Sequence, residues 1–438
     1  MLEFGTDGVR GRANQELTPE FALSFGRALA RVFEPKTVVI GRDTRVSGAM
    51  LSSALASGLS SSGVSVVDLG VITTPGVAYI SARRGVVGVV ISASHNPYQD
   101  NGIKVFAPGG MKLESELEMQ IHSVILSGTL NPATDEVGEI VIDSTALDEY
   151  TSYLLSHSGV SESRRLKVVI DCSNGAAVSV APGLFSTLNL DVSFIGVAPD
   201  GKNINQNCGS VYPELLVKEV LERRADFGIA LDGDADRMLG VDSEGRLIDG
   251  DQLMAIFALD LKKQSRLRGD SVVVTVMTNL GFRQSMAKNG ISVHETQVGD
   301  RYVLKALEEE GLSLGGEQSG HIIFRDLATT GDGLLSAVRL VELINRRGES
   351  LAELAKQAMV KLPQSMVSME FEDPKRVVQI PGLADMVSRL EHSLAGSGRI
   401  LVRPSGTEPK VRVMAEASSR ELADSVVGEI CQFLEQHR

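Results

Sequence analysis

Residues 86–104 read VVGVVISASHNPYQDNGIK, an apolar run that leads directly into a polar loop. The run Val86–Ile91 is rich in valine, and a short run of this kind predicts a strand that is buried on both faces. Polar side chains that follow such a strand lie at its end, which is where open α/β sheets bind ligands. This stretch therefore predicts an α/β protein with a ligand site in the loop Ser92–Lys104.

The same pattern recurs along the chain. Valine-rich runs occur at Thr37–Ile40, Lys167–Ile170 and Ser271–Val276. Each leads into a polar or glycine-containing loop, in the sequences TVVIGRDTR, KVVIDCSNGA and SVVVTVMTNLG. Stretches of helical length separate the runs: Thr18 is placed to cap a helix over Glu20–Val32, and Ser47 is placed to cap the next helix. The alternation predicts α/β layers with mainly parallel sheets, in three similar units of about 100–150 residues.

The C-terminal part has a different pattern. Strands are predicted over Gln364–Phe371, Gly398–Val402 and Val411–Glu416, and a helix from Glu421 to the end. These elements predict a small α+β unit. A chain of 438 residues has room for several domains, because a single core seldom exceeds about 250–300 residues. We therefore expect four domains, at residues 1–145, 146–250, 251–362 and 363–438.

The composition is typical of a soluble globular protein, with 43% hydrophobic and 23% charged residues. The net charge of −13 argues against nucleic acid or an anionic membrane as the main partner, although an anionic metabolite needs only a local cluster of cations. Cys172, Cys208 and Cys431 lack the CxxC spacing, so we expect reduced thiols. The N-terminus shows no signal peptide, and no apolar run reaches the ~20 residues of a membrane span. We expect a cytoplasmic protein.

The loop Asp232–Arg237, DGDADR, follows the apolar run Phe227–Leu231 and carries an acidic residue at every second position. In an extended loop, three such carboxylates converge on one hard cation. An EF-hand also begins in this way, but it requires glycine at the sixth position and glutamate at the twelfth, where this chain has Arg237 and Ser243. A solvated acidic turn is the alternative. The pattern favours a Mg²⁺ site whose ligands are Asp232, Asp234 and Asp236.

The loop Ser92–Lys104 brings hydroxyl groups next to basic side chains. Ser92, Ser94 and His95 cluster beside a turn, and Lys104 follows. This set offers a nucleophilic hydroxyl and a base or electrostatic helper. A simple turn is the alternative, because Asn-Pro favours turns.

Three further loops carry polar groups. GEQSGH at Gly316–His321 offers hydrogen-bonding groups suited to sugar hydroxyls, and RPSGTEPK at Arg403–Lys410 offers one guanidinium, two hydroxyls and accessible backbone N–H groups for an anion. GTDGVRGR at Gly5–Arg12 brings two arginines into a loop that could touch a phosphate. Each of these loops alone could be a surface turn. Together with the serine and metal loops they predict a cleft between domains that handles a phosphorylated sugar with Mg²⁺.

In this order and spacing, the five loops resemble those of the α-D-phosphohexomutase superfamily, and the resemblance runs from Phe4 to about Glu416. It implies four domains in a heart shape around a central cleft that holds the active site: three related α/β domains with mixed sheets and a smaller C-terminal domain. It also implies a reaction in which phosphate moves between O1 and O6 of a hexose through a phosphoserine enzyme and a 1,6-bisphosphate, with one Mg²⁺ per chain.

The resemblance assigns roles to individual residues. Ser94 would carry the phosphate, and the metal shell would comprise Ser94, Asp232, Asp234 and Asp236, with Arg237 near it. The catalytic groups beside Ser94 would be Arg10, His95 and Lys104, with Lys104 as the general base or acid. The sugar-binding residues would be Glu317, Gln318, Ser319 and His321. The residues that grip the other phosphate would be Arg403, Ser405, Gly406 and Thr407.

Within the superfamily, five segments look like the bacterial phosphoglucosamine mutase branch: FGTDGVRG, ISASHNP-x-x-DNGIK, PDG-x-NIN-x-x-CGS (Pro199–Ser210), GGEQSGHI and TTGDG (Thr329–Gly333). Gln318 is the most useful mark. This branch interconverts glucosamine 6-phosphate and glucosamine 1-phosphate for cell-wall precursors. Two positions depart from the pattern: Ala235 stands where glycine is common, which we expect to be harmless in a spacer position, and Lys410 is more typical of the mannose and glucose branch. A phosphomannomutase/phosphoglucomutase is therefore the alternative.

Two other classes of protein compete with a mutase. A metal-dependent phosphatase would need no second phosphate cradle at Arg403–Thr407, and a non-catalytic sugar-phosphate binding protein would not need Ser94, Lys104 and three aspartates together. The sequence leaves open whether the protein is a monomer or a homodimer.

Overall fold

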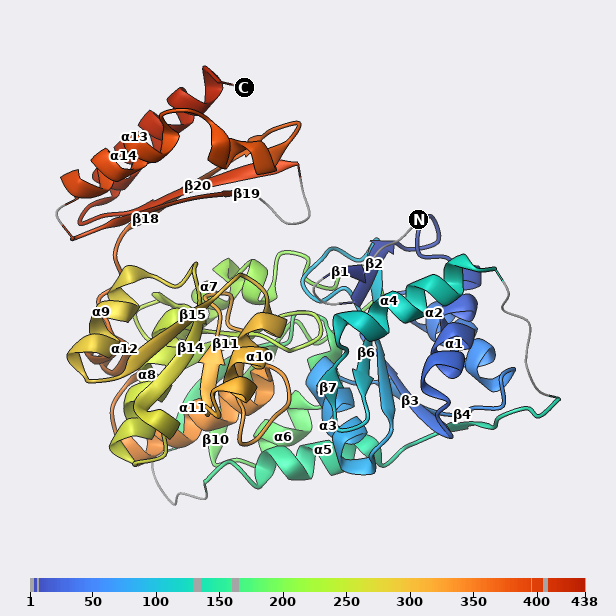
Figure 1. Cartoon of the computed structure of the whole chain (residues 1–438). Helices are drawn as coiled ribbons and strands as arrows, with labels where there is room; N and C mark the ends of the chain where they lie inside the picture. Colours follow the sequence, from blue (N-terminus) through green and yellow to red (C-terminus); the bar gives the residue numbers. More distant parts are fainter. Residues whose placement is uncertain are drawn as a thin grey trace. The chain divides into compact units, whose positions relative to one another are not determined.

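The structure, a computed structural model of the chain, describes residues 4–5, 8–128, 135–159, 165–394, 396–404 and 409–437. The chain divides into two compact units (Figure 1). The first comprises Met1–Met277 and Ile291–Gln357, and the second comprises Thr278–Gly290 and Ala358–Arg438. Three sheets lie in the first unit and a fourth lies in the second.

The three sheets of the first unit share one strand order. The first contains β3 (Thr37–Arg42), β4 (Ser65–Val71), β5 (Val87–Ile91) and β6 (Asp100–Ala107). The second contains β9 (Leu166–Asp171), β10 (Leu190–Ile195), β11 (Phe227–Leu231) and β12 (Met238–Asp242). The third contains β14 (Ser271–Thr275), β15 (Ser292–Thr296), β16 (Leu314–Gly316) and β17 (Ile322–Phe324). In each sheet the spatial order is second, first, third and fourth strand of these sets.

The pairing directions are also shared. The first three strands of each set are parallel, and the fourth pairs antiparallel with the third. This common topology confirms the prediction of three related α/β units with mixed sheets. The polar loop after the third strand of each set connects the antiparallel pair. The serine, metal and sugar loops therefore occupy equivalent places in three successive units.

The first sheet is extended at both edges. Its additional strands are β1 (Phe4–Gly5), β2 (Gly8–Arg12), β7 (Met111–Lys112) and β8 (Ile140–Ile142). Because β2 pairs with β6, Arg10 lies on a strand opposite Gly102, and Lys104 also lies on β6. Our assignment of Arg10 and Lys104 to loops was therefore wrong. A long-range pairing between residues near the N-terminus and residues near 100 leaves no local signal in the sequence.

Helices cover both faces of the first sheet, and they are α1 (Pro19–Phe33), α2 (Gly48–Ser60), α3 (Thr74–Arg84) and α4 (Ser115–Leu126). The next helix, α5 (Ala146–Leu155), packs against α3. Thr18 caps α1 as predicted, because its Oγ1 accepts from Phe21 N at 3.2 Å. Ser47 precedes α2 but does not cap it: its Oγ accepts instead from Asn101 Nδ2 at 2.8 Å. A competing buried amide thus overrides the local capping preference.

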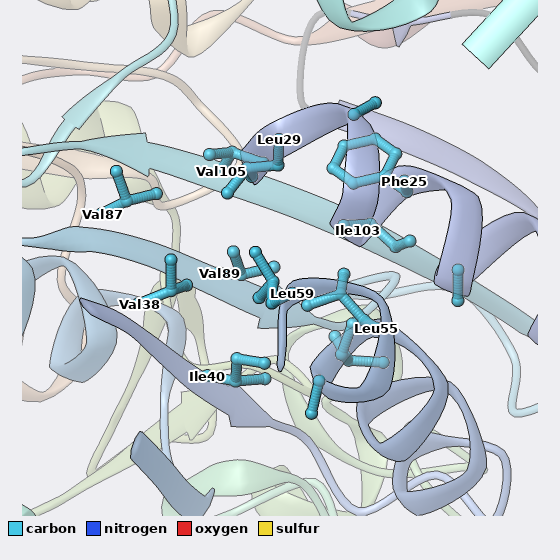
Figure 2. Close-up of a cluster of buried hydrophobic side chains, with 14 of the residues drawn as sticks. Phe25, Leu29, Val38, Ile40, Leu55, Leu59, Val87, Val89, Ile103 and Val105 are labelled. Carbon is cyan, nitrogen blue, oxygen red and sulfur yellow. The ribbon is translucent and has the colours of Figure 1, made fainter. Parts of the chain in front are cut away.

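The core of this domain lies between the sheet and α1 and α2 (Figure 2). Phe25 and Leu29 of α1 meet Leu55 and Leu59 of α2 above strand residues such as Val89, and all are fully buried. The two helices approach closely at Gly26, where an added Cβ would lie 2.4 Å from Leu55 O. Burying side chains of this size contributes about 1.5–3 kcal/mol each, which holds the strand ends in place.

The second and third domains are covered by α6 (Ala181–Ser186), α7 (Glu214–Arg223), α8 (Gly250–Lys263), α10 (Asp300–Glu309), α11 (Gly333–Arg347) and α12 (Leu351–Ala358), and β13 (Leu247–Ile248) extends the second sheet. Asp249 and Gln252 form a capping box at the start of α8. Asp332 caps α11 by accepting from Leu335 N at 2.9 Å, and it also accepts from the hydroxyl of Tyr150 on α5 at 2.7 Å. This hydrogen bond connects α11 of the third domain to α5, the helix that follows the first domain.

The second unit is a three-stranded antiparallel sheet of β18 (Gln364–Glu370), β20 (Lys410–Glu416) and β19 (Arg399–Pro404), with α13 (Leu383–Ser393) and α14 (Arg420–Glu435) on one face (Figure 1). It also contains α9 (Leu280–Lys288). The fully buried Glu416 accepts from Arg399 Nε at 2.7 Å and from Leu280 N at 2.8 Å, which joins α9 to the sheet. The predicted small α+β unit is confirmed.

Two further expectations concern the chain as a whole. Cys172, Cys208 and Cys431 are free thiols. Within the described ranges, no helix combines the length and the apolar character that a bilayer crossing requires.

Candidate active site

The serine loop of the first domain meets the metal loop of the second. Ser94 follows β5, and its Oγ donates to Asp232 Oδ2 at 2.6 Å, although the two residues are 138 positions apart. Both side chains are almost fully buried, with exposed fractions of 1% and 0%. The short bond between a hydroxyl and a carboxylate brings the predicted nucleophile and the first predicted metal ligand together.

Asp232, Asp234 and Asp236 form a buried cluster, and each offers one carboxylate oxygen within 4.8 Å of the others. Burial and then the neighbouring carboxylates of Asp236 and Asp234 raise the pKa of Asp232 well above its usual value. The Oδ1 atoms of Asp234 and Asp236 have no hydrogen-bond partner among the described residues. Like charges with unused buried oxygens are costly unless a cation joins them, and an all-oxygen donor set suits Mg²⁺. The residues fit the predicted metal.

Two side chains of the first domain hold Asp234. Lys104 Nζ donates to Asp234 Oδ2 at 2.8 Å and lies 3.7 Å from Asp236 Oδ2. Thr74, at the start of α3, donates its hydroxyl to Asp234 Oδ2 at 2.6 Å and its N–H to Asp234 O at 3.0 Å. The sequence predicted a place for Lys104 in the site. Thr74 was missed, because a threonine in a helix start carries no signal of a contact 160 positions away.

Further cations surround the cluster. Arg237 donates its N–H to Asp232 Oδ1 at 3.2 Å, and its Nε lies 3.8 Å from Asp236 Oδ1. Burial and then the charges of Arg237 and Arg10 lower the pKa of His95 to about 4, so this imidazole is neutral at pH 7. His95 Nδ1 lies 3.3 Å from Ser94 Oγ. A phosphate attached at Ser94 would therefore lie beside the imidazole of His95 and close to the arginines Arg10 and Arg237.

The metal loop contains one strained position. Ala235 has φ +57°, which is a left-handed conformation that costs a residue with a Cβ about 1–2 kcal/mol. Its carbonyl accepts from Gly333 N at 2.9 Å, so the conformation is held by α11. Our expectation that alanine is harmless here stays a prediction, although its left-handed conformation carries strain that glycine would not. The side chain of Ala235 offers no metal ligand, but the backbone at this position is left-handed, which is why glycine suits it.

The sugar loop of the third domain turns between β16 and β17. Glu317 Oε1 accepts from Gly299 N at 3.1 Å, next to α10. Ser319 Oγ is buried without a hydrogen-bond partner in the part of the chain that the structure describes. Gln318 Nε2 donates instead to Asp251 Oδ2 on α8 at 3.2 Å. Gln318 is thus bonded to α8, whereas its neighbour Glu317 is bonded beside α10.

His321 ends the sugar loop in a buried position beside the metal cluster. Its Nδ1 lies 3.7 Å from Asp236 Oδ2, and its Nε2 accepts from Gly331 N at 3.1 Å. Burial would lower the pKa of His321, but the adjacent carboxylate of Asp236 outweighs burial and raises it. His321 has an exposed fraction of 2%, so its imidazole interacts with Asp236 rather than with solvent.

Arg403 of the second unit lies in the last part of β19, directly opposite Arg412 on β20. Burial and then the charge of Arg412 lower the pKa of Arg403. Arg403 Nε is buried without a hydrogen-bond partner within the described ranges. A pair of opposed guanidinium groups is unfavourable unless an anion offsets the charge. Ser405, Gly406 and Thr407, which we also expect to bind phosphate, lie outside the described residues.

The chain matches family models for all four domains of phosphoglucomutase/phosphomannomutase. The alpha/beta/alpha domains I, II and III match residues 1–131, 148–245 and 249–362, and the C-terminal domain matches residues 366–433.

Individual relatives agree with these models. The chain is 48% identical to a phosphoglucosamine mutase of Desulforamulus reducens over 98% of both chains. It is similar in structure to a phosphoglucomutase/phosphomannomutase family protein of Burkholderia thailandensis, with a TM-score of 0.82 and 25% identity over 98% of this chain and 97% of the other. It also shares its fold with an Aspergillus fumigatus N-acetylphosphoglucosamine mutase, solved in complex with GlcNAc-6P and magnesium, with a TM-score of 0.71 and 19% identity over 98% of this chain and 95% of the other.

Proposed function

The chain belongs to the phosphoglucomutase/phosphomannomutase family, one of the α-D-phosphohexomutases, and on that premise we propose that it interconverts glucosamine 6-phosphate and glucosamine 1-phosphate. The observation that carries the proposal is the 2.6 Å bond between Ser94 Oγ and Asp232 inside a buried cluster of three aspartates. A serine at this position is ready to carry a phosphate next to a cation.

Ser94 would be the phosphate carrier, and Asp232, Asp234 and Asp236 would hold Mg²⁺ together with the phosphoserine. A bound Mg²⁺ would offset the negative charge of the phosphoryl oxygens as the group moves. Arg10 and Arg237 would bind those oxygens from the sides. Phosphoserine carries about −1.5 to −2 charges at neutral pH, so these cations are needed before a second anion can approach.

Lys104 would move the proton of the reacting sugar hydroxyl. Its Nζ now donates to Asp234 at 2.8 Å, at the edge of the carboxylate cluster. A general acid or base must lie within hydrogen-bond reach of the proton that it moves, and the place of Lys104 beside the metal loop meets this condition. His95, which is neutral at pH 7 because its pKa is about 4, would contribute as a hydrogen-bonding neighbour of Ser94.

Groups outside the metal cluster would hold the sugar. Glu317 and Ser319 would bind its hydroxyls, since Ser319 Oγ is buried and unpartnered among the described residues. Gln318 and His321 would complete this group from its edges. Arg403, with Ser405, Gly406 and Thr407, would grip the phosphate that is not transferred. The 1,6-bisphosphate formed midway would turn over in the site, so that its other phosphate returns to Ser94.

The identity of the sugar rests on the relatives. A chain that shares 48% of its residues with a phosphoglucosamine mutase over nearly the full length of both proteins is expected to use the same sugar. The alternative is a phosphomannomutase/phosphoglucomutase with the same mechanism, which the structural neighbour of Burkholderia thailandensis also permits. Gln318, the residue most typical of the glucosamine branch, is bonded to Asp251 of α8. The effect of Gln318 on sugar specificity therefore needs a direct test.

Several wider features belong to the same proposal. We place domain limits at 1–145, 146–250, 251–362 and 363–438. The enzyme would work in the cytoplasm as a monomer or homodimer and supply precursors for cell-wall synthesis. Hexose 1,6-bisphosphate would act as activator as well as intermediate.

The test is a mutase assay with Mg²⁺ and a hexose bisphosphate primer. The 1- and 6-phosphates of glucosamine, glucose and mannose are compared, with Ser94→Ala in parallel. We expect the highest kcat/KM with glucosamine phosphate and no turnover by Ser94→Ala. A higher kcat/KM with glucose or mannose phosphate would establish the alternative sugar. Turnover by Ser94→Ala, or net release of phosphate by the wild type, would contradict the mutase mechanism.

A further inference from the structure

Ser94 has a backbone conformation that the residue does not favour by itself. Its φ of +52° is left-handed, which costs a residue with a Cβ about 1–2 kcal/mol. Glycine would adopt this conformation without strain, but glycine has no hydroxyl. Strained residues of this kind persist only where their surroundings hold them. Something other than the local sequence must therefore hold Ser94.

Arg45, from the GRDTR sequence after β3, is the first such restraint. Its Nη2 donates to Ser94 O at 2.8 Å and to Asn96 O at 2.9 Å, and its Nη1 donates to Asp100 O at 3.0 Å. Its Nε donates to Asp43 Oδ2 at 2.9 Å, and neither side chain of this ion pair is exposed. A planar guanidinium buried in this way has few other positions open to it.

Asn205 of the second domain grips the same two carbonyl groups. Its Nδ2 donates to Ser94 O at 2.9 Å and to Asn96 O at 3.1 Å. Its Oδ1 accepts from Ser173 Oγ at 2.7 Å, and this bond determines which end of the amide faces the serine loop. Each of the two carbonyl oxygens thus accepts one bond from each domain.

A third restraint acts on the N–H of the nucleophile. Ser94 N donates to Ser92 Oγ at 2.9 Å, and Ser92 Oγ donates in turn to Asp43 Oδ2 at 2.6 Å. Asp43 therefore supports both Arg45 and Ser92. These bonds form a network around the peptide groups on both sides of Ser94. The side chain of Ser94 lies outside this network and is directed at Asp232 of the metal loop.

We propose that Arg45 and Asn205 are positioning residues, which clamp the carbonyl groups of Ser94 and Asn96 and thereby aim Ser94 Oγ at the metal loop. The inference rests on the proposed function, because it concerns the residue that would carry the phosphate. The second domain then contributes twice to phosphoryl transfer, through the aspartates and through the orientation of the serine. Displacement of a reacting group by about 1 Å can cost roughly 100-fold in rate.

The clamp can be opened without disturbing the backbone. Asn205 is itself left-handed, with φ +58°, so Asn205→Gly removes the amide and keeps a favoured backbone conformation. Asn207→Gly is the matched control, because Asn207 is exposed and left-handed, with φ +53°, in the same loop. Both variants carry the same change in unfolded-chain entropy.

The first readout is steady-state kinetics of purified full-length protein with the bisphosphate primer. We expect Asn205→Gly to lower kcat by about 10- to 100-fold relative to Asn207→Gly, with KM within about twofold because the sugar and phosphate contacts remain. Equal kcat values for the two variants would overturn the proposal. So would a fall in kcat/KM carried by KM alone.

The second readout does not depend on the substrate. Amide hydrogen exchange in peptides that cover residues 92–99 should be faster in Asn205→Gly than in Asn207→Gly, with wild-type protection elsewhere in the β5–β6 region. Unchanged exchange in this segment would overturn the clamp even if the wild type turned over another hexose phosphate. A wild type without mutase activity would overturn the proposed function and leave this comparison valid.

Arg45→Lys provides an independent variant. Lysine keeps the charge beside Asp43 but loses the planar fork that reaches two carbonyl groups. We expect a loss in kcat of about tenfold or more with little change in KM. A wild-type kcat in Arg45→Lys together with a wild-type kcat in Asn205→Gly would exclude any role of the clamp in catalysis.

Discussion

The serine loop of the first domain and the metal loop of the second occupy the same place in the same topology, yet they are held differently. Each joins the third strand of its set to an antiparallel fourth strand, and each contains a left-handed residue other than glycine, Ser94 and Ala235. Around Ser94 the restraints are side-chain donors from two domains. Around Ala235 they are backbone bonds, from Ala235 N to Asp232 O and from Gly333 N to Ala235 O.

The difference follows from what each side chain does. The hydroxyl of Ser94 is needed at its position, so the strain has to be offset by specific donors. The methyl group of Ala235 is fully buried but makes no polar contact, so its strain has no chemical purpose. The left-handed conformation therefore serves the reaction at Ser94, whereas at Ala235 it only allows the metal loop to turn. Four substitutions test this distinction between the loops.

The largest effect is expected from Ser94→Ala. Loss of a nucleophile that acts with its neighbours as a unit costs about 10³-fold or more in kcat. Because alanine keeps the backbone donors and acceptors of the clamp, the melting temperature should change little. Intact-mass spectrometry should detect one phosphate on the wild type and none on the variant. Ser186 is an exposed serine of the second domain, so Ser186→Ala serves as the control. This variant should keep the phosphate on Ser94 and the activity of the wild type.

The next largest effect is expected where the two loops touch. An added Cβ at Gly233 would lie 2.6 Å from Ser94 O and 2.8 Å from Asn205 Nδ2. Gly233→Ala should therefore displace the serine loop, lower kcat by about 10- to 100-fold and destabilise the protein by about 1–3 kcal/mol. Kinetics and denaturant unfolding measure the two effects.

Gly183→Ala is the control for this substitution, since nothing lies within 4 Å of an added Cβ there. It should leave kcat unchanged, and because Gly183 lies in helix α6 it should stabilise the protein by about 0.5–1 kcal/mol. If Gly233→Ala were equally neutral in kcat, the serine loop and the metal loop would not depend on one another.

A third prediction concerns the cation. At a hundredfold excess over its dissociation constant, Mg²⁺ should stabilise the wild type by about 2.7 kcal/mol. Asp232→Asn removes one of three buried like charges, so without metal it should be at least as stable as the wild type, while most of the gain from Mg²⁺ should disappear. Thermal unfolding with and without MgCl₂ measures both quantities. Wild-type stabilisation of Asp232→Asn by Mg²⁺ would place the metal elsewhere.

The smallest effect is expected from Ala235→Gly. Relief of the left-handed strain is worth about 1–2 kcal/mol, and the extra flexibility of glycine in the unfolded chain costs about 0.5–1 kcal/mol. A net gain of about 0.5–1 kcal/mol in the free energy of unfolding is expected from these opposing terms, with unchanged kcat. Chemical denaturation followed by circular dichroism can resolve a change of this size. A loss of activity would show that the Ala235 methyl group has a role after all.

Much of the fold could be predicted from local patterns. Valine runs such as Val86–Ile91 showed where the central strands lie, because burial on both faces requires an unbroken apolar sequence. The strands β2 and β6 were harder, because they carry charged and polar residues such as Arg10, Asp100 and Lys104 and so resembled loops. A strand of this kind is specified by its pairing partner, and the partner lies far away in the sequence.

The candidate site divides in the same way. Asp232, Asp234 and Asp236 stand out because acidic residues at every second position in a strand-end loop would repel one another unless a cation joined them. Arg45 did not stand out, since one arginine in a polar loop is common. Asn205 lies in the segment Pro199–Ser210, whose resemblance to the phosphoglucosamine mutase branch assigned no role to this residue. Arg45 lies in a segment that marks a strand end, and Asn205 lies in a polar loop of the second domain. The place of Arg45 directly after a predicted strand is the signal that could have revealed it.

The sequence by itself determined the chemistry available to this protein: a serine for phosphate, three carboxylates for a cation, a lysine, and polar loops after buried strands. Local periodicity and residue type are sufficient for that. Only the tertiary structure decided which of these groups meet. Ser94 reaches Asp232 across 138 positions, and Lys104 reaches Asp234 across 130. Such contacts depend on strand order and domain packing, which arise from the burial of whole faces and are not encoded in any single segment.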